Sequence, residues 1–218
     1  MCGRFAMTDS EEIVLNYFQI EYSEVLLKPR FNICPSQDIP VILNQDGTNS
    51  LETLNWGLIP YWAKNPKPMI NARAETAPEK SAFRKAFRKR RCLIPASGFF
   101  EWTIENGKKQ PYYISFKNKR PIAFAGLWDE WSNPESKIIK TCVILTVEAN
   151  SYLKSIHHRM PVILTPEKGM SWLAKAKNED KLKTLLIPYD SENMTAWRVT
   201  RKVNVPAYDN PNCLKKLD

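Results

Sequence analysis

The alternation of hydrophobic and polar residues predicts strands in the middle of the chain. Between residues 91 and 147, short runs are rich in β-branched and aromatic residues, which favour strands. These runs cover residues 99–104, 112–116, 121–127 and 138–146. Asn106-Gly107 separates the first two runs, and because this dipeptide suits a two-residue turn, it predicts a hairpin.

Helical spacing of hydrophobic residues predicts several helices around these strands. Within residues 78–91, Phe83, Ala86 and Phe87 recur at helical spacing, while lysine and arginine fill many other positions. That basic face is equally typical of a solvated surface and of a phosphate-binding one. Further helices are expected over residues 9–18, 149–156, 166–176 and 180–186, and a last strand over residues 197–204. Strands with segregated helices indicate the α+β class, with a curled, barrel-like and mainly antiparallel β core flanked by helices.

Length and composition point to one folded domain. The 218 residues are 43% hydrophobic and 11% aromatic, which is enough for a packed core. No repeat or low-complexity linker divides the sequence, so we expect one domain over residues 1–218. No run approaches the roughly 18 consecutive apolar residues of a membrane span, and the start lacks a secretory pattern. We expect a monomeric, cytoplasmic protein without a membrane partner.

Charge and cysteine content narrow the classes of ligand. Lysine and arginine number 32 against 23 aspartate and glutamate, and the formal charge of +9 favours a polyanion such as nucleic acid. Many basic proteins carry such charge only as a solubilising surface, so the charge alone does not decide. The five cysteines are scattered and none lies in a CxxC pair, which argues against disulfides and a structural zinc site. We expect no bound metal.

Cys2 is the position with the most distinctive chemistry. Removal of Met1 is favoured when the second residue is small, and it would leave a chain that begins with an amine and a thiol on neighbouring carbons. Their reference pKa values, about 7.7 to 8.0 and about 8.5, make both nucleophiles available near neutrality. With an aldehyde, the amine forms an imine and the thiol then closes a five-membered thiazolidine ring. The alternative is a frayed terminus without a role.

Three further positions are candidates for proton transfer or hydrogen bonding. Glu101 follows an apolar stretch, where burial would raise its pKa toward the range useful for proton transfer; an outward position on a strand is the alternative. His157 and His158 are the only histidines in the sequence, so imidazole chemistry must come from one of them. Asn71 could orient a substrate through its amide or, as asparagine often does in loops, cap a turn.

Seven ordered segments resemble the SRAP family, the SOS-response-associated peptidase proteins that process abasic sites. One such segment would be a weak signal, whereas seven in order are specific and cover most of the chain. The segments are residues 1–5 (MCGRF), 30–35 (RFNICP), 56–60 (WGLIP), 71–76 (NARAET), 91–102 (RCLIPASGFFEW), 156–161 (IHHRMP) and 203–204 (VN). Cys34, Ala74 and Phe100 stand where the family usually has alanine, serine and tyrosine. These departures affect packing and fine substrate contacts but remove no catalytic group.

The resemblance implies a role for individual residues. Cys2 is the crosslinking nucleophile, in a pocket with Asn71, Glu101 and His157, and Glu101 and His157 transfer protons. His157 is preferred to His158 because the family's active histidine follows the isoleucine and leaves one residue before the arginine. The implied DNA contacts are Arg4, Asn32, Trp62, Arg73, Arg84, Thr146 and Arg159. Arg4, Arg73 and Arg159 would hold phosphates beside the lesion, and no cofactor is implied.

The expected function is capture of abasic sites in single-stranded DNA. The ring-opened sugar has a free aldehyde at C1′, which the amine and thiol of Cys2 would trap as a covalent thiazolidine. Glu101 could also catalyse slow release, since the same groups serve the reverse step. Two alternatives stay open. A terminal cysteine can attack a peptide carbonyl, with removal of Met1 as the nearest target, or a non-enzymatic protein could bind single strands by aromatic stacking.

Overall fold

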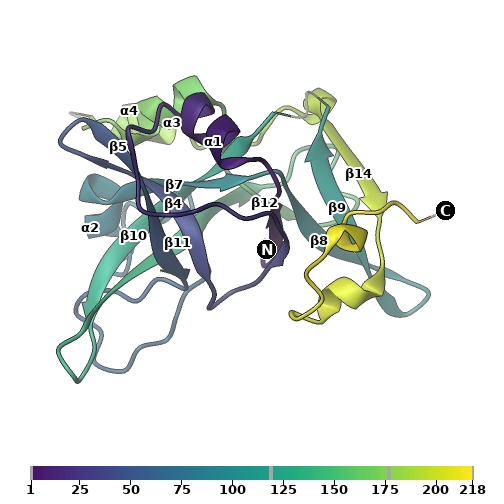
Figure 1. Cartoon of the computed structure of the whole chain (residues 1–218), viewed down its shortest axis with the longest axis horizontal. Helices are drawn as coiled ribbons and strands as arrows, with labels where there is room; N and C mark the ends of the chain where they lie inside the picture. The colour runs from purple at the N-terminus through teal and green to yellow at the C-terminus, as the bar shows by residue number, and fades with distance from the viewer. Residues whose placement is uncertain (1, 118–119, 176–177, 218) are drawn as a thin grey trace.

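A closed barrel of five strands forms the left-hand part of the computed structural model in Figure 1, which describes residues 2–117, 120–175 and 178–217. The barrel strands are β4 (Asp38–Gln45), β5 (Thr48–Trp56), β7 (Arg91–Ala96), β10 (Ile122–Ser132) and β11 (Ile138–Glu148). Four antiparallel pairings run β5-β4-β7-β10-β11, and a parallel pairing of β11 with β5 closes the barrel. The predicted α+β class with a barrel-like, mainly antiparallel sheet is confirmed.

Short strands extend the barrel sheet and bring distant segments together on β11. They are β2 (Tyr22–Ser23), β6 (Asn71–Arg73), β12 (Arg159–Pro161) and β13 (Ile163–Leu164). β6 runs parallel to β11, and β12 runs antiparallel to it. Thr146 on β11 is opposite both Arg73 and Pro161. The NARAET and IHHRMP segments therefore meet at one end of a single strand.

A second, five-stranded sheet packs beside the barrel and receives the N-terminal segment (Figure 1). In spatial order its strands are β14 (Met194–Arg198), β9 (Lys108–Phe116), β8 (Gly98–Glu105), β1 (Phe5–Met7) and β3 (Arg30–Ile33). Only Ser97 separates β7 from β8, so the chain passes directly from the barrel into this sheet. β1 pairs antiparallel with β8, with Phe5 opposite Phe99.

Two glycines are required at the ends of β8. The predicted hairpin forms at Asn106-Gly107, whose φ angles of 48° and 71° are the left-handed values that a tight two-residue turn needs. At the other end, a Cβ atom on Gly98 would lie 2.5 Å from the carbonyl oxygen of Ile114 and 2.4 Å from the hydroxyl of Tyr113. Both glycines fix the register of the strand that carries Glu101.

Four of the five expected helices are present in shortened form within the described ranges. The described ranges contain α1 (Glu11–Tyr17), α2 (Arg84–Lys89), α3 (Pro166–Leu173) and α4 (Glu179–Lys183), with 3-10 turns η1 (Ser191–Asn193), η2 (Arg201–Asn204) and η3 (Pro211–Cys213). α1, α3 and α4 correspond to the helices expected over residues 9–18, 166–176 and 180–186. Residue 176 lies outside the described residues.

Other expected elements are wrong in whole or in part. The helix over residues 149–156 is a series of turns, because the bond from the Ile156 N–H to the Leu153 carbonyl spans only three residues and tightens the backbone. Only Arg84–Lys89 is helical within residues 78–91. The last strand lies earlier, at Met194–Arg198, since the side chain of Thr200 caps the turn that follows.

Aromatic packing anchors the N-terminal strand to the barrel. Phe5 is fully buried, and its ring makes edge-on contacts with Trp56 and Phe124 at centroid distances of 5.3 and 5.7 Å. Burial of such a ring is worth about 2 to 3 kcal/mol. Cys2, three residues earlier, is thereby held at the junction of the two sheets.

Within the described ranges, we find no helix of the length and apolarity needed to cross a membrane.

Candidate functional site

Cys2 lies alongside Glu101 because of the pairing between β1 and β8. The backbone N–H of Phe100 donates to the carbonyl of Arg4 over 2.9 Å, which continues the antiparallel register toward the N-terminus. Cys2 is fully buried, and its thiol contacts the Arg4 carbonyl at 3.8 Å. Burial and the negative charge of Glu101 raise the pKa of the Cys2 thiol. The thiol is therefore protonated at neutral pH unless a base takes its proton.

Asn71 holds the backbone of Cys2. It is the first residue of β6, opposite Ile144 of β11, and its Nδ2 atom donates to the Cys2 carbonyl over 2.8 Å. Asn71 is thus not a turn cap but a bridge from the barrel to the N-terminal segment. Its Oδ1 atom is buried and has no hydrogen-bond partner in the part of the chain that the structure describes.

Glu101 is a buried carboxyl group with a perturbed pKa. The residue is only 3% exposed, and burial raises its pKa from 4.5 to about 7. The reading of Glu101 as an outward strand residue is therefore excluded. At neutral pH the group exists in both protonation states, so it can donate or accept a proton.

His157, and not His158, faces Glu101. Its Nδ1 atom lies 3.9 Å from Glu101 Oε1. The same atom lies 3.0 Å from both the backbone nitrogen and the carbonyl oxygen of Arg159, so it accepts or donates there according to the tautomer of the ring. Burial lowers the pKa of His157, which keeps the ring neutral near pH 7. His158 is exposed and stacks on His157 at a centroid distance of 4.4 Å.

Arg4 and Asn32 form a buried connection to the C-terminal segment. Arg4 Nη1 donates to Asn32 Oδ1 over 2.8 Å and to the carbonyl of Val203. Asn32 is fully buried, and its Nδ2 atom donates to the carbonyls of Val203, Val205 and Tyr208. Asn32 therefore orients Arg4 and has no surface of its own for a ligand.

Arg159 and Thr146 make a similar arrangement beside His157. Arg159 binds both carboxylate oxygens of Glu75, at 2.8 and 2.9 Å, and also donates to the Thr146 carbonyl. The side chain of Arg159 is 12% exposed, and Thr146 is fully buried. Sequence reasoning missed Glu75, although it stands in the NARAET segment. The ion pair between Glu75 and Arg159 depends on the pairing of both β6 and β12 with β11, which the sequence alone does not indicate.

Two arginine Nε atoms next to these residues have unused hydrogen-bonding capacity. Within the described ranges, Arg4 Nε and Arg159 Nε are buried without a partner, as is Asn71 Oδ1. Buried polar groups are usually satisfied in folded proteins, and exceptions often mark places where a ligand completes the bonding. Arg4 Nε, Arg159 Nε and Asn71 Oδ1 thus offer two donors and one acceptor to a ligand with oxygen and N–H groups.

The remaining predicted DNA contacts lie on the surface. Arg73 and Arg84 are exposed, and Trp62 is 52% exposed. Sequence reasoning also missed Trp102, whose indole N–H donates to Asn204 Oδ1 over 2.8 Å. Trp102 directly follows Glu101, so its place in the same segment of residues 91–102, which resembles the family, was the available signal. The structure thus brings Cys2, Asn71, Glu101 and His157 together and leaves Arg73, Arg84 and Trp62 outside that cluster.

A family model described as SOS response associated peptidase (SRAP) matches residues 1–206. The chain belongs to the SRAP family. The abasic site processing protein YoqW of Bacillus subtilis is 42% identical over 222 residues, which cover 99% of each chain. The abasic site processing protein HMCES of Xenopus tropicalis is 30% identical, over 87% of this SRAP chain and 67% of its own length. A crystal structure of a Bacteroides thetaiotaomicron protein matches all of both chains with a TM-score of 0.90 at 29% identity.

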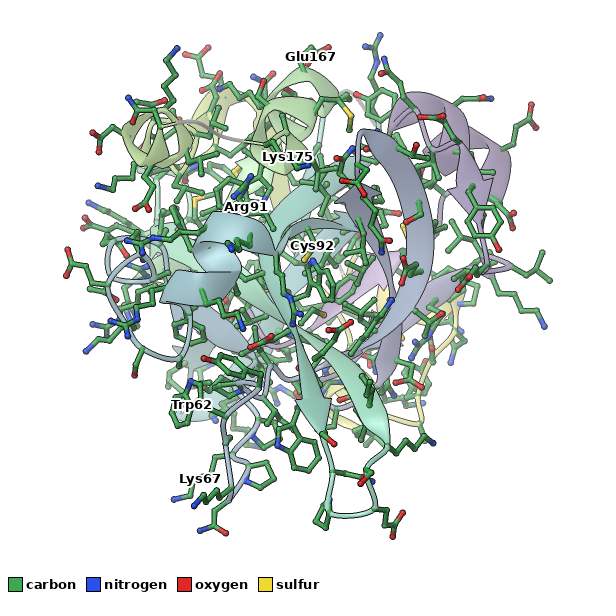
Figure 2. The ribbon with its side chains drawn as sticks, turned by 90° about the vertical axis from the view of Figure 1, so that its left-hand side faces the viewer. Trp62, Lys67, Arg91, Cys92, Glu167 and Lys175 are labelled. Carbon is green, nitrogen blue, oxygen red and sulfur yellow. The ribbon has the colours of Figure 1, made fainter. Side chains whose placement is uncertain are left out.

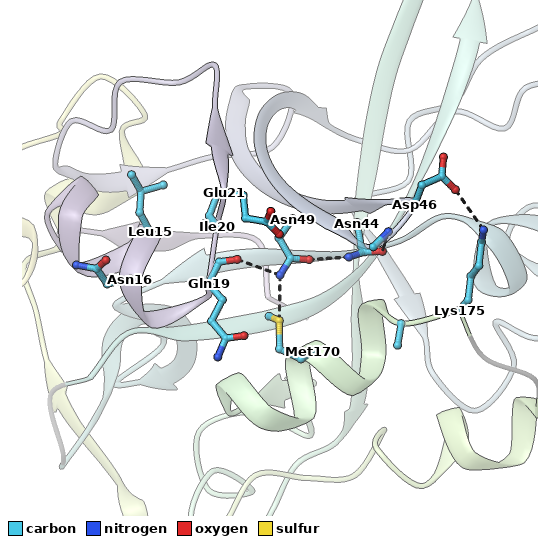
Figure 3. A pocket seen from close by; sticks show the side chains of 12 residues that line it. Leu15, Asn16, Gln19, Ile20, Glu21, Asn44, Asp46, Asn49, Met170 and Lys175 are labelled. Carbon is cyan, nitrogen blue, oxygen red and sulfur yellow. Dashed lines mark hydrogen bonds and ion pairs between the residues drawn. The ribbon is translucent and has the colours of Figure 1, made fainter.

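A cavity of this SRAP chain lies away from Cys2, Glu101 and His157. It has a volume of about 770 Å³ and lies between α1, the β4-β5 hairpin and α3 (Figure 3). Amide side chains dominate its polar lining, and Asn49 there bonds to Asn44, the Gln19 carbonyl and Met170. Neither this cavity nor any group of acidic, cysteine and histidine side chains in the described residues forms a candidate metal centre.

Proposed function

We propose that this SRAP chain processes abasic sites in single-stranded DNA, and that Cys2 forms a covalent thiazolidine with the sugar aldehyde. The observation that carries the proposal is the hydrogen bond from Asn71 to the Cys2 carbonyl, which holds the cysteine beside a buried carboxyl group of pKa about 7. The relatives described above are abasic site processing proteins, which supports the same substrate.

The reaction begins at the amine of Cys2, once Met1 has been removed. Met1 lies outside the described residues. The amine attacks the C1′ aldehyde to form a carbinolamine, and loss of one water gives the protonated imine. Protonated Glu101 donates to the departing hydroxyl group, and its pKa near neutrality suits this task. The vacant Oδ1 of Asn71 can accept an N–H of the amine and keep its lone pair directed at the aldehyde.

The thiol of Cys2 completes the adduct. Its raised pKa means that the proton must leave as sulfur attacks the imine carbon. The Glu101 carboxylate, formed in the preceding step, accepts that proton, while the nitrogen of the protonated imine keeps its proton and receives the electron pair of the C=N double bond. A C–S bond forms, the C=N double bond becomes single, and no further group leaves. The balance over both steps is one aldehyde and one aminothiol giving one thiazolidine and one water.

His157 is suited to opening the sugar ring. An abasic sugar rests mostly as a cyclic hemiacetal, so its aldehyde appears only after the 1′-hydroxyl loses a proton and the ring oxygen gains one. A neutral imidazole, which the lowered pKa provides, can take the first of these protons. The contact between His157 and Glu101 at 3.9 Å gives a short path for returning it.

We assign the DNA contacts according to exposure. Arg73 and Arg84 would contact phosphates, and Trp62 would stack on a base. Arg4 and Arg159 would offer their unpaired Nε–H groups to the phosphates beside the lesion. Asn32 and Thr146 act indirectly in this proposal. Each binds one of these arginines and fixes the direction of its guanidinium.

Single-stranded DNA with one abasic site should react at least about tenfold faster than the same site in a duplex, because a stacked site must first be unstacked.

Arg73→Ala should weaken binding to all sequences and lower the slope of log K against log salt by about 0.7. Lys168→Ala, an exposed cation on α3, is the matched control. Heat-stable bands on a denaturing gel measure the reaction. Equal rates with duplex, or an Arg73→Ala protein with unchanged salt dependence, would contradict the proposal.

A further inference from the structure

His157 and His158 form a stacked pair beside the buried carboxyl group of Glu101. Their ring centroids are 4.4 Å apart and the ring planes differ by 29°, so the two imidazoles lie nearly face to face. Side chains of neighbouring residues in an extended strand point to opposite faces. His158 lies at a bend just before β12, which lets its ring cover one face of the His157 ring.

Backbone hydrogen bonds fix the segment that carries this pair. The N–H of His157 donates to the carbonyl of Leu153 over 2.9 Å, and the carbonyl of His158 accepts from the N–H of Ala149 over 3.0 Å. The second of these bonds extends the pairing of β12 with β11 by one step. The backbone of both histidines is therefore held, and rotation of the side chains is the freedom that remains to the rings.

The stack restricts the ring that is suited to proton transfer. His157 Nδ1 lies 3.0 Å from the backbone nitrogen and the carbonyl oxygen of Arg159 and 3.9 Å from Glu101 Oε1, so one edge of the ring is held. His158 covers one face of the same ring and is itself exposed. With an edge and a face both in contact, the His157 ring has one favoured orientation. Loss of the stack would release the face.

His158 also acts on the charge of His157. Two imidazolium rings 4.4 Å apart repel each other, so the first proton goes to the exposed ring and the second is disfavoured. Burial lowers the pKa of His157, and the positive charge of His158 lowers it further. His157 therefore stays neutral at a pH where a single imidazole would already be protonated.

Glu101 does not cancel this repulsion. Burial raises the pKa of Glu101 to about 7, so its carboxyl group is mostly neutral in the acidic range where the histidines titrate. The raised pKa of the Cys2 thiol keeps that group neutral in the same range. The amine that removal of Met1 leaves on Cys2 is positively charged there, and this charge is common to every variant of His158.

The remaining charges around the pair are compensated by ion pairs. Glu148, the last residue of β11, lies 3.5 Å from Lys154 on the turn before the histidines. Arg159 binds both carboxylate oxygens of Glu75. Each pair brings one positive and one negative charge, so neither replaces the effect of a proton on His158.

We propose that His158 is a positioning residue for His157, which it holds by ring stacking and keeps neutral by charge repulsion. A neutral His157 can accept a proton under mildly acidic conditions, where an isolated imidazole cannot. The assignment rests on the proposed function, in which His157 takes a proton from the abasic sugar. It adds control over the pH range in which that step can occur.

An NMR titration of the imidazole signals in DNA-free protein tests the charge repulsion. The sequence contains only two histidines, so His158→Phe leaves a single imidazole signal, that of His157. Phenylalanine keeps a stacked ring without the charge. The titration midpoint of His157 should then lie about 0.5 to 1 pH unit higher than in the wild type, and His158→Ala should raise it by a similar amount.

Two exposed lysines provide matched controls for the loss of one positive charge. The Lys154 side chain is 59% exposed on the turn before the pair, and Figure 2 shows Lys67 on the loop between β5 and β6. Lys154→Gln and Lys67→Gln should each leave the His157 midpoint within about 0.2 pH unit of the wild type, because exposed charges are screened. An unchanged midpoint in His158→Phe, or an equal rise in Lys154→Gln, would overturn the charge repulsion.

The rate of adduct formation under saturating DNA tests the stacking. At pH about 8, where both histidines are neutral, His158→Phe should react within about twofold of the wild type. His158→Ala should be about fivefold slower, because its His157 ring is free to rotate away from the productive orientation. Equal rates in the two variants would overturn the positioning role. The NMR titration needs no DNA, so it gives its result even if Cys2 forms no adduct.

Discussion

A chain that keeps any residue in front of Cys2 is expected to form no stable adduct with abasic single-stranded DNA. The retained residue converts the amine into an amide, whose lone pair is delocalised into the carbonyl and cannot form an imine. We expect the yield of heat-stable crosslink to fall by about a hundredfold or more, since nucleophilic chemistry is lost and not merely weakened. A denaturing gel, with the N-terminal residue identified in each preparation, measures the effect.

Cys2→Ala separates the two functional groups of the cysteine. The amine survives in this variant, so a labile imine should form that borohydride can trap, while the durable thiazolidine should be absent. Cys34→Ala is the matched control, because it removes a buried thiol at the end of β3. A Cys2→Ala protein whose adduct survives heating as well as that of the wild type would exclude ring closure by the thiol.

Glu101→Gln is expected to slow adduct formation by about a hundredfold or more, the usual contribution of a positioned acid/base group.

The Glu101→Gln change should also stabilise the fold at alkaline pH. The folded-state pKa of Glu101 is about 7 and its ordinary value is 4.5, so the folded chain holds a proton that the unfolded chain releases between these values. Stability is therefore greatest below pH 4.5 and falls as pH rises through about 7.

The loss of stability at alkaline pH follows from the difference between the folded-state and ordinary pKa values of Glu101. A difference of about 2.5 units between 4.5 and about 7 corresponds to at most about 3 kcal/mol of stability lost above pH 7. Glutamine has no such titration, so Glu101→Gln should unfold later than wild type at pH about 8 and similarly at pH about 4. Glu148→Gln is the control, because its side chain is 73% exposed on β11. A wild-type pH profile in Glu101→Gln would show that the carboxyl group is not destabilised by burial.

The sequence predicted local features of the fold better than long-range ones. The hairpin at Asn106-Gly107 was foreseen because its turn is decided by two adjacent residues. Asp46-Gly47 is an equally clear turn signal between β4 and β5, with φ angles of 52° and 98°, and it was overlooked. The parallel pairing of β5 with β11 joins residues about 86 positions apart, and no local pattern specifies it.

In the candidate site, too, local features were predicted from the sequence and long-range packing was not. The amine and thiol of Cys2 were evident from its position in the sequence, and the choice of Asn71, Glu101 and His157 came from the family resemblance. Asn32 and Thr146 were expected as DNA contacts, yet both are fully buried and bind arginines. Their burial depends on which segments pack against β3 and β11, and that information is not contained in the segments themselves.

The mass of the N-terminal peptide after reaction with abasic single-stranded DNA tests the central claim most directly. Wild-type protein would be incubated with the DNA, digested with protease and nuclease, and analysed by fragmentation. The account predicts a peptide that begins at Cys2 and carries the abasic sugar, with a mass equal to the sum of both parts minus one water. Fragmentation should leave both the amine and the sulfur of Cys2 attached to C1′. An unmodified Cys2 peptide, or a sugar attached to lysine or to another cysteine, would contradict it.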